Sequence, residues 1–183
     1  MNPAKQYLSD GITLAVVKGD TVYTSCERGV APLMNFLDSG ICIDGFSCAD
    51  KVVGKGAAFL YVLLKVKEVH ACVLSICAKE ILERYSISVT YDTLVERIQN
   101  RDKTGFCPIE EAVLNISSPE SALIAIKKKL EILRSKLVDL ITFVDVSILA
   151  CKKYIRIKDN GAEILWDCKE ESKIYFKIFS KIW

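Results

Sequence analysis

Several features that would point directly to a function are scarce or missing in this sequence of 183 residues. It holds a single histidine, His70, which restricts histidine-based chemistry. The formal net charge is only +2, too balanced to predict a nucleic-acid partner. No apolar run reaches the roughly 18 residues of a membrane span, so no stable membrane insertion is expected. Residues 1–10 also lack the apolar segment of a secretory signal, and these absences favour a cytoplasmic protein.

The eight cysteines are not spaced as Cys-x-x-Cys anywhere, so neither a zinc finger nor a disulfide framework is predicted. What is present is the composition of a packed globule, with 51% hydrophobic and 26% charged residues. A chain of this length is able to bury a substantial core. Reduced thiols agree with a cytoplasmic location.

The apolar periodicity predicts strands that alternate with helices. Strands are expected over residues 12–17, 21–25, 41–49, 69–74 and 86–91, the first two as a hairpin, and a helix over 30–39. Asp50 is predicted to cap a central helix that reaches about residue 67, and Ser75 to cap the next helix. Further helices are expected from Pro108 and from Ser118.

The last third of the chain changes character. The helix from Ser118 carries an apolar seam from Leu123 to Val144, typical of a core helix or a short dimerising coil. Beyond it, Asn160-Gly161 lies between two strand-like segments and predicts a β-hairpin. We therefore expect one domain over residues 1–135 and a C-terminal extension, with this hairpin, over residues 136–183.

Four short phrases carry a family resemblance, namely GVAPL at 29–33, ADKVVGK at 49–55, NR at 100–101 and CPIE at 107–110. Together with the order of strands and helices, they resemble a small family of uncharacterised prokaryotic proteins with a cytidine-deaminase-like fold. The resemblance covers about residues 4–130. It implies an α/β fold, specifically a three-layer α-β-α sandwich around a mixed sheet.

The chain departs from true deaminases at the positions that matter for zinc. Those enzymes hold zinc with a His or Cys and a Pro-Cys-x-x-Cys pair, and a Glu moves the proton. The matching positions here are Cys48, Asp50, Cys77 and Glu80. The resemblance therefore implies a non-deaminating protein with no cofactor. The alternative is a divergent metal-dependent deaminase or hydrolase, in which Cys48, Cys77 and Glu80 hold zinc and Asp50 acts as acid or base.

The same region has charges that favour an anion. Lys51 and Lys55 lie one turn apart at the expected helix N-terminus, where backbone donors attract phosphate. Asn100-Arg101 either adds a clamp or fastens the following loop. The predicted ligand is a nucleotide or another phosphorylated small molecule, bound by Asp50, Lys51, Gly54, Lys55, Asn100 and Arg101.

Simpler interpretations stand beside these predictions. The two lysines would also serve as solvated charges at a helix end. His70 is expected to be a structural histidine, and Glu110 to complement the dipole of the helix that begins at Pro108. A third hypothesis is a structural homodimer with a vestigial pocket, formed through the seam from Leu123 to Val144.

Overall fold

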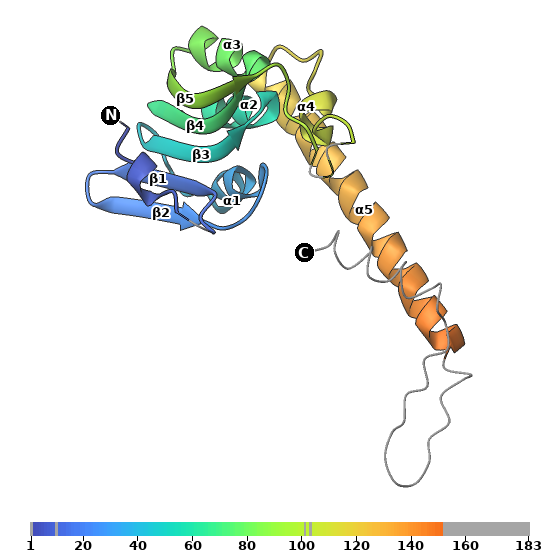
Figure 1. The fold of residues 1–183 in the computed structure, drawn as a ribbon. Coiled ribbons are helices and arrows are strands. Elements are labelled where there is room, and N and C mark those ends of the chain that lie inside the picture. Colours follow the sequence, from blue (N-terminus) through green and yellow to red (C-terminus); the bar gives the residue numbers. More distant parts are fainter. Residues whose placement is uncertain (1, 10, 101, 103, 152–183) are drawn as a thin grey trace, which may run out of the picture. The chain divides into compact units, whose positions relative to one another are not determined.

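The computed structural model describes residues 2–9, 11–100, 102 and 104–151, with side chains up to residue 135 (Figure 1). The chain divides into two compact units, Met1–Arg134 and Ser135–Trp183. The predicted hairpin at Asn160-Gly161 falls outside the described residues. In the described part of the chain, no helix has the length and apolar character that crossing a membrane requires.

A five-stranded mixed sheet forms the first unit, in the order β2-β1-β3-β4-β5 (Figure 1). Its strands are β1 (Leu14–Lys18), β2 (Thr21–Ser25), β3 (Ser47–Val53), β4 (Glu68–Ser75) and β5 (Ser88–Val95). β1 pairs antiparallel with both β2 and β3, whereas β3, β4 and β5 run parallel to one another. The carboxyl ends of the last three strands therefore meet at one edge.

Three α-helices connect successive strands, namely α1 (Ala31–Ser39), α2 (Lys55–Leu63) and α3 (Ile76–Arg84). The 3-10 helix η1 (Lys5–Tyr7) precedes β1, and the α-helices α4 (Pro108–Ala112) and α5 (Pro119–Cys151) follow β5. The observed order from β1 to β5 confirms the order predicted from the sequence. The predicted end of the helix over 30–39 and the predicted cap at Ser75 are also confirmed. Gly40 ends α1 with a φ of 70°, and the Ser75 hydroxyl accepts a hydrogen bond from the N–H of Ala78 at 3.2 Å.

The two faces of the sheet are covered differently. One face packs against α1, α2 and α3 in a single core, whose buried members include Leu14, Val16, Cys48, Val69, Leu33, Phe59 and Leu82. The alternate residues Ala15, Val17 and Ala49 face the other way and pack with Ala4, Tyr7 and Leu8 around η1. Among the described residues the second face thus carries one 3-10 helix, and the second helical layer of the predicted sandwich is not confirmed.

The central segment differs from the prediction. Asp50 does not cap a helix but lies within β3, which is paired on both sides. α2 begins only at Lys55, after Gly54 in an extended conformation with φ −97° and ψ 176°, and it ends at Leu63. A local capping signal was outweighed by long-range pairing, because a central strand satisfies its backbone groups with two neighbours.

The seam of α5 is partly used within the first unit. Ile126 is fully buried in the main core, and Leu123 and Leu130 pack against it. The beginning of the seam is therefore a core surface. Its continuation toward Val144 lies where side chains are not described, so the homodimer hypothesis stays a prediction.

Candidate functional site

The carboxyl ends of β3, β4 and β5 lie side by side, and two helices begin directly after them (Figure 1). α2 follows Gly54, α3 follows Ser75, and β5 runs into the segment 96–100. In sheets with parallel strands, ligands bind at this edge, close to helix N-termini. This edge is where a ligand is to be expected.

A buried carboxylate already lies at this edge. Glu110 of α4 is only 2% exposed. Its Oε1 accepts hydrogen bonds from the N–H of Lys55 at 3.2 Å and from the Ser75 hydroxyl at 2.5 Å. Its Oε2 accepts from the N–H of Ile98 at 2.7 Å. The N-terminus of α2, where the sequence predicts a bound phosphate, thus contacts an anion of the chain itself.

Two glycines make room for these contacts. A Cβ at Gly54 would lie 3.1 Å from Cγ1 of Ile98 and 3.4 Å from Oε1 of Glu110. A Cβ at Gly56 would lie 2.7 Å from Cγ2 of Ile109, closer than real Cβ atoms approach. Both glycines therefore allow other residues of the same chain to approach closely.

The predicted anion site has a different geometry from the one expected. β3 carries Asp50 and Lys51 while α2 carries Lys55, so the three residues do not share a helical turn. Lys55 Nζ donates to the carbonyl oxygen of Leu114 at 2.5 Å, and Lys51 is half-buried on its strand. The expected helical arrangement is wrong. A role of these residues in binding stays a prediction.

Asp50 belongs to a buried polar pair. Its Oδ2 accepts from the Tyr61 hydroxyl at 2.8 Å, and its Oδ1 accepts from the N–H of Val52 at 3.0 Å. Burial raises the pKa of Asp50 to about 6, although both hydrogen bonds act to lower it. Burial also raises the pKa of the Tyr61 hydroxyl. Because Asp50 is 7% exposed and Tyr61 is 0% exposed, the pair is sealed from a solvent-borne substrate.

The structure does not assemble the zinc site of the metal-dependent alternative. Cys48 is buried in the core, where desolvation raises the pKa of its thiol, whereas Glu80 is exposed on α3. Across the described residues, the one group of three potential ligands within 4.8 Å of one another is His70, Cys72 and Asp92. None of Cys48, Asp50, Cys77 and Glu80 belongs to it.

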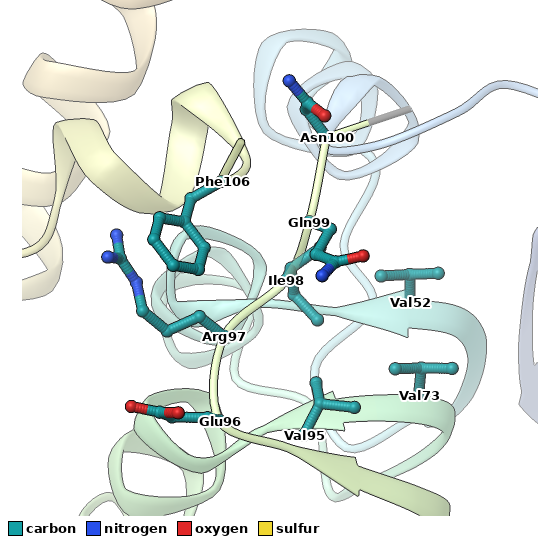
Figure 2. A pocket seen from close by; sticks show the side chains of 9 residues that line it. All are labelled: Val52, Val73, Val95, Glu96, Arg97, Ile98, Gln99, Asn100 and Phe106. Atoms are coloured by element: carbon teal, nitrogen blue, oxygen red, sulfur yellow. The ribbon is translucent and has the colours of Figure 1, made fainter. Parts of the chain in front are cut away.

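A groove of about 520 Å³ opens at the carboxyl edge of the parallel strands. It is lined by Val52, Val73, Val95, Glu96, Arg97, Ile98, Gln99, Asn100 and Phe106. Figure 2 shows the three valines, one from each parallel strand, as a row on one side of the groove. This volume falls within the roughly 300 to 1,000 Å³ of small-molecule sites, and the mixture of apolar and polar side chains is typical of them.

Arg97 is the cation of this groove. Its guanidinium carbon lies 3.8 Å from the centroid of the Phe106 ring (Figure 2). Its Nε is buried and has no hydrogen-bond partner among the described residues. A buried donor without a partner is costly, and the planar guanidinium suits carboxylate and phosphate groups. The Nε is thus a polar atom without a partner beside the groove, and Figure 2 shows the guanidinium pointing toward Phe106 and away from Val52 and Val73.

Asn100 fastens the loop that follows it. Its Oδ1 accepts from the N–H of Thr104 at 2.9 Å and from that of Gly105 at 3.3 Å, and its Nδ2 donates to the Thr104 hydroxyl at 3.1 Å. Of the two roles that the sequence allows, the contacts support fastening. Arg101 lies outside the described residues.

Sequence reasoning missed the main residues of this edge. An acidic residue in the first turn of α4 is explained by the helix dipole alone. The sequence therefore gives no reason to expect that Glu110 has hydrogen-bond partners far away in the chain. Arg97 and Phe106 belong to no motif. They meet because an isolated bridge between Gln99 and Phe106 folds the chain back on itself. Only the polar character of residues 96–100 directly after a strand hints at a site here.

The fold and the groove define an α/β protein with a candidate ligand site at the carboxyl ends of parallel strands. Residues 4–130 match the family described as TM1506, a domain of unknown function (DUF1893), and the chain belongs to this family. It is similar to the crystal structure of a DUF1893 family protein, TM1506, from Thermotoga maritima. The two are 27% identical with a TM-score of 0.59, over 67% of this chain and 81% of that chain. No curated protein matches the chain.

Proposed function

We propose that this protein binds a small anionic molecule with a planar ring, a nucleotide or a related phosphorylated compound, in the groove at the carboxyl ends of β3, β4 and β5. The observation that carries the proposal is Arg97, whose buried Nε lacks a partner and whose guanidinium stacks on Phe106. An anionic group of the ligand would complete the hydrogen bonds of this guanidinium.

The remaining features of the groove suit the rest of such a ligand. The valine row of Val52, Val73 and Val95 is an apolar surface for a ring. Gln99 adds one side-chain amide, whose oxygen and nitrogen are able to bond the polar edge of the ligand ring. Because Glu110 occupies the N-terminus of α2, the anionic group is assigned to Arg97 rather than to that helix end.

The proposal treats the protein as a non-deaminating member of the cytidine-deaminase-like superfamily. The observed order of strands and helices supports this assignment. The binding step requires no cofactor, and no zinc-dependent deamination is expected. The six described cysteines are free thiols, which suits the cytoplasm as its compartment.

Isothermal titration of the full chain against a panel of nucleoside mono-, di- and triphosphates tests this function. We expect one compound to bind, and Arg97→Gln to weaken its binding by about 10- to 100-fold, since a hydrogen bond to a charged group contributes about 1.5 to 3 kcal/mol. Arg97→Lys should restore little, because lysine lacks the planar fork.

The matched control is Arg84→Gln, which makes the same chemical change at an exposed position in the last turn of α3. Binding by this variant should equal that of the wild type. If the wild type binds none of these compounds, or if Arg97→Gln binds as tightly as Arg84→Gln, the proposed function is wrong.

A further inference from the structure

Three potential metal ligands lie together on the face of the sheet that α1, α2 and α3 leave free. His70 pairs with Ala49 across β3 and β4, and Ala49 belongs to the cluster around η1. Cys72 follows two residues later on β4 and so projects from the same face. Asp92 lies on the neighbouring strand β5. The ligand atoms of His70, Cys72 and Asp92 all lie within 4.8 Å of one another.

His70 is held as a metal ligand would be. Its side chain is 5% exposed, and its Nδ1 lies 2.9 Å from the Thr90 hydroxyl. In the tautomer that donates from Nδ1 to Thr90, Nε2 keeps a free lone pair. That Nε2 is buried without a hydrogen-bond partner among the described residues, and Oδ2 of Asp92 lies 3.5 Å from it. Metal-binding histidines are oriented by such a contact of the second nitrogen.

A cation of the chain already neutralises part of this cluster. Lys5 of η1 places its Nζ 2.7 Å from Oδ1 of Asp92. The two side chains are 45% and 46% exposed, so water weakens the ion pair and either partner is able to leave it. Lys5 also lines an open hollow of about 370 Å³ beside η1, which gives its side chain space to turn away. The exposed side of Asp92 provides an entry path for an ion from solution.

We propose that Nε2 of His70, Sγ of Cys72 and a carboxylate oxygen of Asp92 bind a divalent transition-metal ion of the Zn²⁺ class, with a fourth position open to water. A nitrogen, a sulfur and an oxygen ligand are the set that Zn²⁺ and Co²⁺ accept. Ligand atoms around tetrahedral zinc lie roughly 3.5 Å apart, and Nε2 and Oδ2 already have this separation. Because the ligand atoms lie within 4.8 Å of one another, Cys72 has to approach the other two by about 1.3 Å at most. The site shares no residue with the groove at Arg97.

Binding should depend on pH in a defined direction. The thiolate of Cys72 is the ligand, so the thiol proton passes to solvent when the metal–sulfur bond forms. Burial and the neighbouring Asp92 carboxylate raise the pKa of the Cys72 thiol. Because that proton competes with the metal for the sulfur, affinity should increase as the pH rises.

Titration of the metal-free full chain with Co²⁺ tests the site, because a cobalt–thiolate bond gives an ultraviolet charge-transfer band. We expect this band to saturate at one ion per chain and to disappear when Zn²⁺ competes. Cys72→Ser should abolish the band, and His70→Gln should weaken Co²⁺ binding by at least about tenfold. Lys5→Gln should strengthen binding, because it frees Asp92 from its competitor.

The control is Cys77→Ser, a half-buried cysteine of α3 outside the cluster, which should leave the band unchanged. Circular dichroism checks that each variant is folded. Lys5→Gln gives an independent reading if His70→Gln does not fold, because Lys5 lies in an exposed ion pair. The proposal is overturned if the wild type shows no band, if Cys72→Ser keeps it, or if Lys5→Gln binds Co²⁺ less tightly.

Discussion

At the scale of single residues, the buried Asp50 links the fold to pH. Its pKa is about 6 in the folded chain, against an ordinary value of 3.8. The folded state therefore holds the proton more tightly than the unfolded chain does. The resulting stabilisation is fully present below about pH 4 and is lost as the pH rises through about 6.

We expect Asp50→Asn to remove this dependence, because an amide resembles the protonated carboxyl and does not ionise. Between about pH 8 and about pH 4, the wild type should gain about 2 kcal/mol of unfolding free energy relative to the variant. Urea unfolding of both proteins across this range measures the difference. Other titrating groups are common to both proteins and cancel.

Tyr61→Phe provides the control for this pair. The Tyr61 hydroxyl lowers the pKa of Asp50, so its removal should move the midpoint of the pH dependence to higher pH. A difference between wild type and Asp50→Asn that is constant with pH would contradict a raised pKa at Asp50.

At the scale of elements, α2 and α4 pack at a distance that only glycine allows. Gly56 faces Ile109, and a Cβ there would lie 2.7 Å from Cγ2 of that side chain. Gly56→Ala should lower the free energy of unfolding by about 1 to 3 kcal/mol through overpacking, even though alanine favours a helix by about 1 kcal/mol over glycine. Urea denaturation measures the loss.

Two further variants isolate the cause of that loss. Gly105→Ala is the matched control, because its Cβ would meet its nearest neighbour, Nδ2 of Asn100, at an ordinary 3.7 Å. In the double variant with Ile109→Ala, the two losses should be less than additive, since the clashing methyl group is gone. Fully additive losses would show that the contact with Ile109 is not the cause.

At the scale of the whole molecule, one carboxylate holds together segments that are far apart in the sequence. Glu110 accepts from Lys55 at the start of α2, from Ser75 at the start of α3 and from Ile98 after β5. These segments form the carboxyl edge of the sheet and border the groove. The shape of the proposed binding site therefore depends on a residue that does not line it.

Glu110→Ala should cost about 3 kcal/mol or more of unfolding free energy, because it leaves two buried donors and one part-buried donor without this acceptor and opens a cavity. Glu110→Gln should cost less, about 1 to 3 kcal/mol, since its amide nitrogen opposes one of these donors. Thermal and urea unfolding measure both. Glu111→Gln, an exposed neighbour on the same helix, should change little, and an equal loss there would contradict the special role of Glu110.

Much of the fold was predictable because its signals are local. The turn at Gly19, the caps at Ser75 and Ser118, and the alternating apolar pattern depend on residues close together in the chain. Asp50 shows the limit of such signals. Before an apolar run it predicts a helix cap, yet the hydrogen bonds of β3 with β1 and β4 override that preference.

The sequence by itself determined the order of the elements from β1 to β5 and the membership of a family of unknown function, whereas the bounds of β3 and α2 differ from those predicted. The tertiary structure alone decided which of the functional groups lie next to one another. It placed Glu110 against the start of α2, Arg97 on Phe106, and His70 beside Cys72 and Asp92. The physical reason is the sequence separation between the residues that interact. Caps and periodicity act over a few residues, whereas a binding site forms where strand register and packing bring distant side chains together.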